Sequence, residues 1–586
     1  MAISAKETLR VFLFEALGSA GVNELSQEDV LLENAPAYTN ADYASNVAFV
    51  AASYKGSSPR AVAEELSKAL RERPDVGNVL ADVSVAGAGF INLRLSQACL
   101  KGELEKALGA GEEFGKGDLC KGKKIIIEFT DPNPFKEFHV GHLYSNTVGE
   151  SLARLFEWQG GEVKRANYQG DVGMHVAKAM WGTQAKMQEE KISLAVLGGK
   201  GLRERIAFWG GGYAKGAEAF EESEEVKKEI ALLNAQIYEK NAAIKELYET
   251  GKAWSLEYFE EIYRRLGTHF DYYFFESEIA DRGLELVKEY AKKGVFEESK
   301  GAIVFAGERY GLHTRVMVNS MGLPTYEAKE LGLAFAKQEV FPFDQSFIIT
   351  ANEVDSYFTV ILRALHEINP ELAEKNHHFS HGMVRLPQGK MSSRKGNIVT
   401  GESLLDEAKT RAFSLIESSG AKKHIGKEEK EEVAEKVAVA AVKYALLKHA
   451  LGHDIIFSFD EAVTFEGDSG PYLQYTYART QSVLARSEKN YDDETIWGEL
   501  NESELALLRA ILRFPEAALF AAQNHAPHAL CTFLFEVAKH FNAFYGANRI
   551  VGGGADEPKR LALTKAVGTV LQKGLWLLGI RAPQAM

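Results

Sequence analysis

The sequence predicts an α/β protein in which a parallel-sheet domain follows a small α+β domain and precedes an all-α bundle. Strand-like and helical segments alternate over residues 124–400, which is typical of a parallel sheet with crossover helices. Residues 401–586 are almost wholly helical in pattern and contain few prolines, which predicts a helix bundle. A chain of 586 residues is also too long for one hydrophobic core, so several domains are expected.

The predicted organisation has three parts. Residues 1–112 form the α+β domain, with a strand pair at 81–96 and a Gly-rich, charged linker after it. Residues 119–400 form the sheet domain, interrupted at about 186–260 by a Lys/Glu-rich helical insertion. The run Gly210-Gly211-Gly212 predicts a break within that insertion. Strand signals return in three segments that we expect to join the same sheet, at 301–307, 313–326 and 343–352.

Composition and charge exclude several classes of protein. A net charge of −14 argues against binding nucleic acid over the whole surface, although local basic patches remain possible. Cys99, Cys120 and Cys531 are far apart without a CxxC pattern, so neither a disulfide framework nor a structural zinc site is expected. No apolar run is long enough to span a membrane, and Glu15 interrupts the N-terminal apolar segment that a signal peptide would need. A reducing, cytoplasmic location is therefore predicted.

The stretch Lys124–Leu143, KIIIEFTDPNPFKEFHVGHL, predicts half of a nucleotide-binding unit. A short apolar strand leads through a Pro-rich loop into an amphipathic helix, and phosphate binds at the first turn of such a helix. Gly141 lets a ligand approach the backbone, and His139 and His142 share one face of the helix. The same two histidines could instead be a metal pair or surface residues.

A second stretch, Lys390–Asn397, reads KMSSRKGN and predicts a basic, glycine-bearing loop. Cationic loops of this kind close over a triphosphate and neutralise charge on the leaving pyrophosphate. Alone, this octamer is more typical of a solvated surface turn. In combination, HVGH and the later KMSSR resemble the two signatures of class I aminoacyl-tRNA synthetases, whose catalytic domain is Rossmann-like.

Further motifs resemble the arginyl-tRNA synthetase family from end to end. They are EFTDPNPFKEFHVGHL, NYQGDVGMHVAK, MGLPTYEAKELGLA, FEGDSGPYLQYTYAR and the N-terminal GAGFINLRL. The resemblance implies an arginine–tRNA ligase that uses ATP with Mg²⁺, without structural zinc. Its implied partners are L-arginine, ATP and tRNA(Arg), with no membrane, and it would act as a monomer.

The resemblance also implies how arginine is bound. Glu128 and Glu330 would supply carboxylates to the guanidinium, which pairs with them in a planar fork. Asn133 would orient the α-ammonium and carboxylate, Tyr326 would close the side-chain pocket, and Asn352 would be a further contact. Alternatively, Glu128 could pair with a lysine and Tyr326 could be core. Two positions depart from the family: Glu330 stands where Asp is usual, and Asn352 where Gln or His is more common.

The ATP site departs from the family's parent KMSKS pattern because Ser393 replaces its second lysine. Arginyl enzymes with this change resemble one another in carrying a lysine just before the histidine tetrad, so Lys136 is assigned the phosphate role, with Lys390, Arg394 and Lys395 in support. The implied catalytic residues are Lys136, His139, His142, Lys390, Ser392, Ser393 and Lys395. The implied ATP-binding residues are His139, Gly141, His142, Lys390 and Met391.

For tRNA, the family's N-terminal domain contacts the elbow loop through an aromatic residue and an Asn two positions apart, which Phe90 and Asn92 match, with Gln97 as a weaker candidate. The C-terminal bundle is expected to bind the anticodon. The expected contacts there are Tyr472, Tyr475 and Arg479, with Tyr477 and Met586 as further candidates.

Two alternative functions stay open at this point. One is another nucleotidyl-transferring enzyme of the same superfamily, including a synthetase for a different amino acid. The other is a catalytically weak, tRNA-binding relative that acts as a scaffold. The helical insertion does not suggest an editing domain, and charge and fork-shaped hydrogen bonds should make one unnecessary for arginine.

Overall fold

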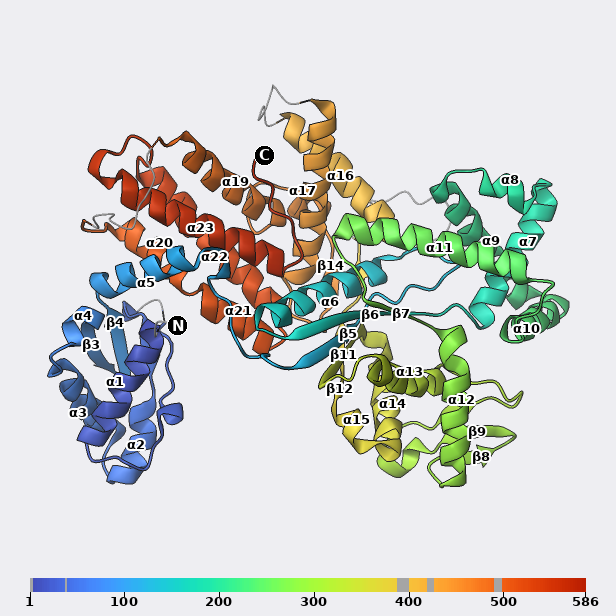
Figure 1. Ribbon diagram of the computed structural model, residues 1–586, viewed down its shortest axis with the longest axis horizontal. Coiled ribbons are helices and arrows are strands. Elements are labelled where there is room, and N and C mark those ends of the chain that lie inside the picture. The colour runs from blue at the N-terminus through green and yellow to red at the C-terminus, as the bar shows by residue number, and fades with distance from the viewer. Residues whose placement is uncertain (1–3, 37–38, 387–399, 419–425, 489–497) are drawn as a thin grey trace.

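The structure is a computed structural model that describes residues 4–36, 39–386, 400–418, 426–488 and 498–586. A helical bundle, a long helical segment and a smaller lobe that carries β8 and β9 lie around a central sheet, and the N-terminal domain lies beside the bundle (Figure 1). The second signature, KMSSRKGN, lies outside the described residues.

The N-terminal domain is a four-stranded antiparallel sheet covered by helices. The strand order is β1-β2-β4-β3, and β3 and β4 form the strand pair that the sequence predicts. Helix α3 begins where Ser58 caps Ala61 N at 3.3 Å and Pro59 takes the first position, which needs no N–H donor. The elements are α1 (Ala5–Ser19), β1 (Glu33–Asn34), β2 (Tyr43–Ser45), α2 (Val47–Lys55), α3 (Pro59–Arg71), α4 (Val76–Val79), β3 (Leu80–Ala86) and β4 (Phe90–Leu95).

The central sheet has five parallel strands in the order β12-β11-β5-β6-β7. Its strands are β5 (Lys124–Glu128), β6 (Glu162–Gln169), β7 (Tyr272–Phe275), β11 (Gln345–Ala351) and β12 (Asn376–His381). Ile125, Ile126 and Ile127 are fully buried because β5 lies in the middle of the sheet with helices on both faces. The strand order reverses between β5 and β11, and ligands of such sheets bind at the carboxyl ends of the strands at this point. The predicted fold class is confirmed.

Helices occupy the whole segment between β6 and β7, beginning before residue 186 and ending after residue 260. They are α7 (Met174–Glu190), α8 (Leu194–Gly198), α9 (Leu202–Glu222), α10 (Glu224–Tyr238) and α11 (Lys245–Leu266). The predicted break at Gly210-Gly211-Gly212 is wrong, since α9 runs through it. A Cβ at Gly212 would overlap the hydroxyl of Thr183, and one at Gly182 would overlap Gly212 O. These glycines therefore allow α7 and α9 to approach closely.

Two of the predicted strand segments do not join the parallel sheet. The segments at 301–307 and 313–326 contain β9 (Ala302–Phe305) and β10 (Arg315–Val318), which pair antiparallel with each other; β8 (Glu297–Ser299) completes a separate three-stranded sheet. The connection between β9 and β10 is too short for a parallel crossover, which needs a dozen or more residues. The segment at 343–352 forms β11, as predicted.

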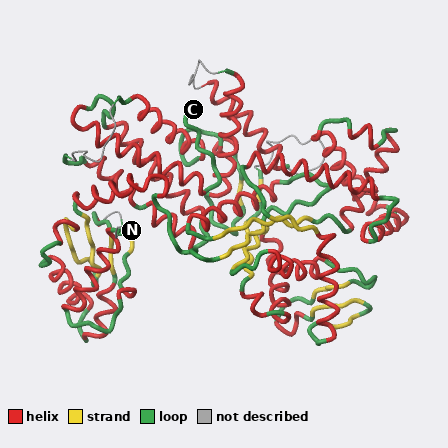
Figure 2. Tube along the Cα trace, viewed as in Figure 1, coloured by secondary structure: helices red, strands yellow, loops and turns green. Residues whose placement is uncertain are grey.

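The C-terminal region is helical, as predicted, and packs against helix α6 (Val140–Trp158) of the sheet domain (Figures 1 and 2). Its helices are α16 (Gly401–Ser418), α17 (Lys427–Leu447), α18 (Phe459–Ala462), α19 (Gly470–Arg486), α20 (Glu502–Leu512), α21 (Phe514–Gln523), α22 (Pro527–Ala547) and α23 (Glu557–Leu577). The remaining elements are α5 (Gln97–Ala110), α12 (Glu276–Lys292), α13 (Tyr326–Val340), α14 (Asp355–Ile368), α15 (Pro370–Glu374), β13 (Val384–Arg385) and β14 (Ile455–Ile456).

Two cationic side chains, on α6 and α17, connect the sheet domain, the helical segment and the C-terminal bundle. Both donate to backbone carbonyls at the ends of α11 and α23. Arg154 on α6 donates to Trp576 O at 2.9 Å and to Gly267 O at 3.0 Å. The buried Lys443 Nζ on α17 donates to Leu266 O at 2.7 Å and to Gly579 O at 2.9 Å. Carbonyls at helix C-termini lack intrahelical donors and carry partial negative charge, so a lysine or arginine stabilises them.

The close contact between α7 and α9 predicts the effect of Gly212→Ala. The added methyl group would meet Thr183 N at 2.9 Å, so the two helices must separate, and we expect a loss of about 1–3 kcal/mol in the free energy of unfolding. Thermal unfolding and faster amide hydrogen exchange in α7 and α9 would measure it. Gly102→Ala on α5 is the control because a Cβ there has nothing within 4 Å. Equal stability of the two variants would contradict the packing role.

Candidate active site

The candidate site lies at the carboxyl ends of β5 and β11, where the loop from Phe129 to His139 leads into α6. Three non-glycine residues of this loop have left-handed backbone conformations: Thr130 (φ 82°), Asp131 (φ 46°) and Phe135 (φ 68°). Such conformations are unfavourable and persist only when surrounding contacts impose them, and they cluster at functional sites.

Three neighbouring elements hold the loop in this shape. Ser145 on α6 accepts from Thr130 N at 2.9 Å, and Ser255 on α11 accepts from Phe135 N at 2.9 Å. Asp131 Oδ1 accepts from Tyr168 N on β6 at 2.8 Å. The loop is therefore fixed from the sheet, from the helix that it precedes and from the helical segment.

The histidine tetrad caps helix α6. His139 is the N-cap residue, and its Nδ1 accepts from Gly141 N at 3.1 Å and from His142 N at 3.4 Å. In return His142 Nδ1 accepts from His139 N at 3.3 Å, and the two rings stack with centroids 3.4 Å apart. Burial lowers the pKa of His139 to about 4 and that of His142 well below its ordinary value. Both imidazoles are therefore neutral near pH 7.

The capping bonds determine the tautomer of both rings. An Nδ1 that accepts a backbone N–H carries no proton, so the proton of each neutral ring is on Nε2. His139 and His142 thus carry Nε2–H donors at the start of α6, next to the positive end of the helix dipole. This arrangement suits an anion such as a phosphate oxygen.

The segment that follows the second signature returns beside the tetrad. Thr400 forms a β-bridge with His139, and Gly401 N donates to Phe138 O at 2.7 Å. The residues predicted within the signature loop lie outside the described residues: Lys390, Met391, Ser392, Ser393, Arg394 and Lys395. The structure thus brings the start of α6 next to the chain that leaves this loop.

Lys136 lies within electrostatic reach of several imidazoles of the site. Its Nζ is 4.3 Å from the ring centroid of Tyr213 on α9, a favourable cation–π contact. Burial is the main cause of the lowered pKa of His139, and the positive charge of Lys136 is the second cause. The same charge also lowers the pKa of His142 and of His175. The helical segment therefore helps to hold a cation beside the tetrad.

Four carboxyl groups gather behind the loop, and two lysines of α13 lie among them. The carboxyl groups belong to Glu128, Asp131, Glu276 and Glu330. Lys337 Nζ lies 2.7 Å from Glu128 Oε2, and Lys329 Nζ pairs with Glu276 Oε2. Both ion pairs are buried.

The excess of carboxyl groups changes their protonation. Burial, and next the charge of Glu128, raise the pKa of Asp131 and of Glu330 well above their ordinary values. Burial raises the pKa of Glu276 to about 7, against the lowering effect of Lys329. A cation that entered this cluster would favour the ionised carboxylates, so the cluster is suited to a positively charged group.

Three polar side chains converge on the space that Gly170 leaves open. A Cβ at Gly170 would overlap Asn133 Oδ1 and would lie 3.2 Å from Glu276 Oε1 and 3.4 Å from His175 Nε2. His175 Nε2 donates to Gly170 O at 2.8 Å, which leaves Nδ1 to accept from the hydroxyl of Tyr326 at 3.2 Å. Tyr326 is half exposed rather than core, and it lies at the edge of the acidic cluster.

The other three predicted arginine contacts, Glu128, Asn352 and Glu330, have different partners in the structure. Glu128 pairs with a lysine, which is the alternative that the sequence left open. Asn352 follows β11 directly, but its Nδ2 donates to Gly452 O at 3.4 Å, in the segment between α17 and β14. Glu330 belongs to the cluster despite the extra methylene, since it interacts electrostatically with Glu128 and Glu276.

Sequence reasoning did not single out Asp131, Glu276, His175 or Lys337. A signal was present for Glu276, because it follows the parallel strand β7 directly, where ligand-binding side chains collect. Asp131 and His175 lie inside motifs that were recognised as a whole. Nothing in the sequence pattern marks Lys337, whose role depends on the packing of α13 against the sheet.

The aromatic and basic residues predicted on the bundle line one pocket of about 460 Å³. Tyr475 stacks on Phe465 with centroids 5.7 Å apart, and the Arg479 guanidinium lies 4.8 Å from the Tyr475 ring centroid. Asn542 Nδ2 donates to Tyr472 OH at 2.8 Å. The pocket lining comprises Ile416, Phe465, Glu466, Tyr472, Tyr475, Arg479, Asn542 and Met586. Tyr477 is core, with 2% of its surface exposed.

The N-terminal candidates differ in exposure. Phe90 is 47% exposed, and its ring lies 5.0 Å from that of Phe49. Asn92 is only 6% exposed on the same strand. Gln97 is exposed at the start of α5 and accepts from Leu500 N at 3.4 Å. Phe90 therefore offers a ring to a partner, whereas the amide of Asn92 is largely covered.

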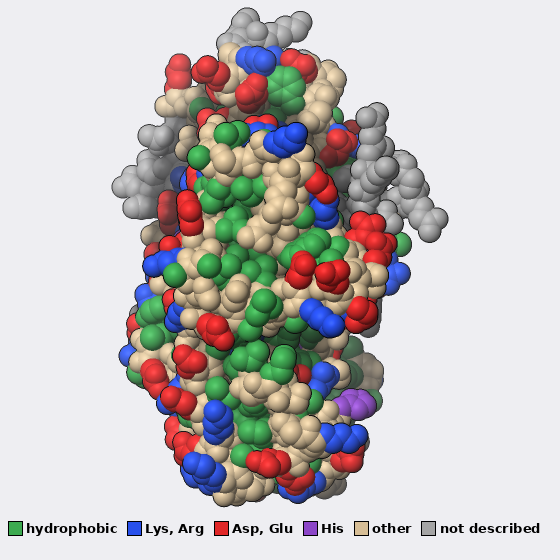
Figure 3. Space-filling view, turned by 90° about the vertical axis from the view of Figure 1, so that its right-hand side faces the viewer, with side chains coloured by type: hydrophobic (Ala, Val, Ile, Leu, Met, Phe, Trp, Pro, Cys, Tyr) green, Lys and Arg blue, Asp and Glu red, His purple; other side chains and the backbone are tan. Residues whose placement is uncertain are grey.

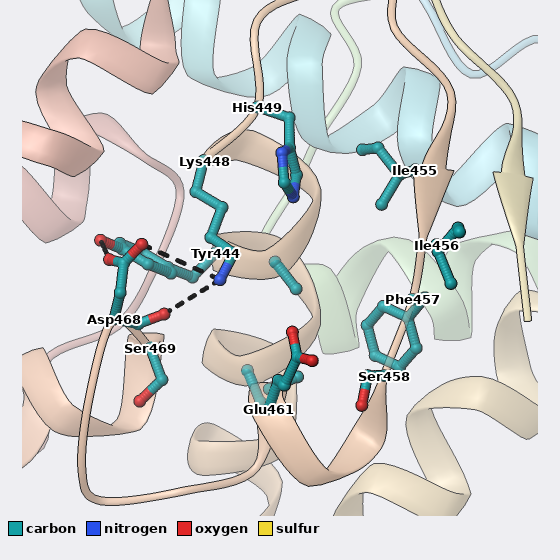
Figure 4. A pocket seen from close by; sticks show the side chains of 13 residues that line it. Tyr444, Lys448, His449, Ile455, Ile456, Phe457, Ser458, Glu461, Asp468 and Ser469 are labelled. Carbon is teal, nitrogen blue, oxygen red and sulfur yellow. Dashed lines mark hydrogen bonds and ion pairs between the residues drawn. The ribbon is translucent and has the colours of Figure 1, made fainter. Parts of the chain in front are cut away.

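A second hollow lies where β14 joins the bundle (Figure 4). Its volume is about 20 Å³, room for about one water molecule. Tyr444 OH donates to Asp468 Oδ1 at 2.6 Å, and Lys448 Nζ donates to Asp468 O at 3.2 Å, so its polar groups bond to one another. This hollow is too small for a nucleotide or an amino acid.

On one face of the molecule, surface charge is mixed rather than segregated. On the face shown in Figure 3, Lys and Arg side chains alternate with Asp and Glu, with apolar atoms exposed between them. Within the described ranges no helix is long and apolar enough to cross a membrane. The same residues contain no group of three or more His, Cys, Asp or Glu that could hold a metal ion.

Three family models match the chain. The model described as "tRNA synthetases class I (R), catalytic domain" matches residues 103–459. "Arginyl tRNA synthetase N terminal domain" matches residues 7–95, and "DALR anticodon binding domain" matches residues 473–586.

Named relatives agree with these matches. An arginine–tRNA ligase of Treponema denticola is 31% identical over 580 residues, which cover 96% of this chain and 96% of that protein. The structure of Thermus thermophilus arginyl-tRNA synthetase is 25% identical, with a TM-score of 0.77 and 99% coverage of both chains. That of Plasmodium falciparum arginyl-tRNA synthetase, at 19% identity, a TM-score of 0.78 and 100% coverage of both chains, shares the fold.

Proposed function

We propose that this chain, which belongs to the class I arginyl-tRNA synthetase family, attaches L-arginine to the terminal adenosine of tRNA(Arg). The family that the sequence motifs indicate is thereby confirmed. In the first step the arginine carboxylate attacks the α-phosphorus of ATP, giving arginyl-adenylate and pyrophosphate. In the second the 2′-hydroxyl of the tRNA attacks the adenylate carbonyl and releases AMP. Neither step needs a protein nucleophile, so positioning and electrostatics supply the rate.

The observation that carries the proposal is the buried excess of carboxyl groups beside the nucleotide motif. Four carboxyl groups face two lysines, and a guanidinium adds a positive charge and planar, paired donors. Glu276 and Glu330 would meet the guanidinium, while Asn133 would orient the α-ammonium and carboxylate. Tyr326, fixed by His175, would close the pocket. Glu128 would border the same pocket through the oxygen that Lys337 leaves free.

At the ATP site, the Nε2–H groups of His139 and His142 would donate to phosphate oxygens, and Gly141 would admit the nucleotide to the backbone. Lys136 would neutralise charge that moves onto pyrophosphate, supported by the loop that carries Lys390 and Lys395. Mg²⁺ would enter with ATP and neutralise phosphate charge. The roles of Met391, Ser392 and Ser393 stay predictions.

The two ends of the chain would bind the tRNA. Phe90 would stack on a base of the tRNA elbow loop, and Asn92 and Gln97 would contact the same loop. The pocket that contains Tyr472, Tyr475, Arg479 and Met586 offers stacking faces and a cation to anticodon bases. We propose a monomer in the cytoplasm, in keeping with a binding region for each substrate on one chain and with three free cysteines.

An aminoacylation assay tests the function directly. Purified protein is given ATP, each amino acid in turn, and tRNA with or without the arginine acceptor. Formation of arginyl-tRNA only with arginine and tRNA(Arg) is the expected result. Charging of another amino acid, or tRNA binding without charging, would overturn it.

Lys136→Ala should lower kcat for arginylation on the order of 10²-fold, because charge on the leaving pyrophosphate loses a cation. Steady-state arginylation measures this effect. Lys186→Ala is the matched control, since Lys186 also lies over an aromatic ring of α9, at 4.2 Å from the Phe208 centroid. An unchanged kcat for Lys136→Ala would assign the phosphate role to Arg394 or Lys395.

Glu276→Gln should raise KM for arginine roughly 10- to 100-fold and leave KM for ATP unchanged, because a hydrogen bond to a charged group is lost. The pKa of Glu276 is raised to about 7, so below this pH its carboxyl is protonated and cannot pair with a guanidinium. Wild-type KM for arginine should therefore fall as pH rises through about 7, and the variant should lose this part of the dependence. The exposed Glu278→Gln on the same helix serves as the control. A pH profile that Glu276→Gln leaves intact would exclude Glu276 from the pocket.

Tyr475→Ala should raise KM for tRNA roughly 5- to 100-fold without changing KM for arginine, because a stacking face for one base is removed. Arginylation of transcripts with altered anticodons provides the control. Wild-type enzyme should discriminate against them, and Tyr475→Ala should discriminate less. Equal discrimination by the two proteins would place anticodon recognition elsewhere.

A further inference from the structure

Lys337 is a buried lysine of α13 that joins the two central strands at the edge of the site. Its exposed fraction is 1%, and its Nζ lies 2.7 Å from Glu128 Oε2 and 3.2 Å from Ser346 Oγ. Glu128 ends β5 and Ser346 lies on the neighbouring strand β11, opposite Ile126. Lys337 therefore holds the sheet together at the point where its strand order reverses.

Glu128 is only 2% exposed, and the groups that face it come from four elements. On α13 these are Lys337 and Glu330; Asp131 follows β5, and Tyr168 lies on β6. The fourth element, β11, adds only the uncharged hydroxyl of Ser346, which shares the ammonium with Glu128. Lys337 forms an ion pair with Glu128, and Asp131 and Glu330 beside it are carboxyl groups, so the buried Glu128 carboxylate depends on this ammonium for charge compensation.

We propose that Lys337 is a positioning residue for arginine recognition, which compensates the buried charge of the Glu128 carboxylate and occupies one of its oxygens so that the other faces the substrate. The inference rests on the proposed arginine pocket and adds a residue that contacts no substrate itself. Two hydrogen-bond partners on two strands fix the direction of the ammonium. A lysine in this position sets both the charge of Glu128 and the side from which the substrate meets it.

The proposal explains why a carboxylate can stay charged among other carboxyl groups. Removing the ammonium leaves Glu128 buried beside Asp131 and Glu330, and a carboxylate in that setting takes up a proton. A protonated Glu128 no longer attracts a guanidinium. The consequence is a pH-dependent loss of arginine affinity, whereas a purely structural role would lower activity equally at every pH.

The test is Lys337→Met in the full-length protein, with arginylation kinetics from about pH 6.5 to about pH 8.5. We expect KM for arginine to rise on the order of 10- to 100-fold at the lowest pH, with KM for ATP unchanged. The ratio of variant to wild-type KM should then fall several-fold toward the highest pH, as Glu128 ionises again. Lys337→Arg, which keeps the charge, should restore most of the affinity and the wild-type pH profile.

Two further variants separate positioning from stability. Lys443→Met removes another buried lysine, which donates to backbone carbonyls of Leu266 and Gly579, and should leave the pH profile of KM for arginine unchanged. Ser346→Ala removes the second partner of Lys337 and should raise KM for arginine a few-fold with kcat preserved. This variant decides the question if Lys337→Met does not fold, and an unchanged KM would overturn the proposal.

The outcomes also separate this inference from the proposed function. If wild-type protein charges no arginine, the function fails and the inference fails with it. If wild-type protein charges arginine and Lys337→Met changes KM for arginine and ATP alike, with the wild-type pH profile, only the positioning role is excluded.

Discussion

A buried surplus of carboxyl groups at the end of the central strand is the constraint on which the rest of the site depends. β5 is covered on both faces, so the carboxylate that ends it is removed from water. Such a charge is costly unless a cation accompanies it, and Lys337 supplies one for Glu128. Among the residues that the structure describes, no ion pair joins Asp131 or Glu330 to a lysine or arginine, and their pKa values rise instead. The cluster is thus short of positive charge.

The surrounding architecture keeps this arrangement in place. The loop that carries Asp131 and Asn133 has left-handed backbone at several non-glycine residues, which its contacts with α6, β6 and α11 impose. The helical segment contributes Tyr213, over which Lys136 lies. Glycines allow α7 and α9 to approach each other closely, so the helical segment between β6 and β7 is tightly packed. The fold therefore places Lys136 and Asp131 on one loop and brings the carboxyl groups of Glu276 and Glu330 to it from α12 and α13.

Much of this organisation could be predicted from the sequence, for identifiable reasons. The parallel sheet followed from the alternation of strands and helices, and the tetrad followed from a strand, a Pro-rich loop and a helix in succession. The β9–β10 pair was misassigned because strand composition does not reveal the partner strand, whereas the short connection between the two does. The break at Gly210–Gly212 was misassigned because glycine lowers helix propensity in isolation, yet here it serves the contact with Thr183.

The residues of the site also divide into those that the sequence indicates and those that only the fold brings together. His139 was singled out because the strand, loop and helix around it form a local pattern, and Asn133 because its motif resembles that of the family. Lys337 and Glu276 were not, because they reach the cluster from α13 and from the start of α12, far away in the sequence. Their role arises only when the sheet places these elements beside β5.

If the cluster is the arginine pocket that we propose, its charge balance would also account for the selection of arginine over molecules of similar shape. A neutral isostere such as citrulline would fill the pocket without supplying the missing positive charge, so buried carboxylates would stay uncompensated. Lysine would supply the charge, but as a compact ammonium that cannot bridge two carboxylates in one plane. Lys329 pairs with Glu276, so an internal ammonium already satisfies part of the need for charge. A substrate must therefore offer more than a point charge, and the paired, planar donors of a guanidinium meet that requirement. In the proposed pocket, this combination of charge and geometry would give selectivity without the need for an editing domain.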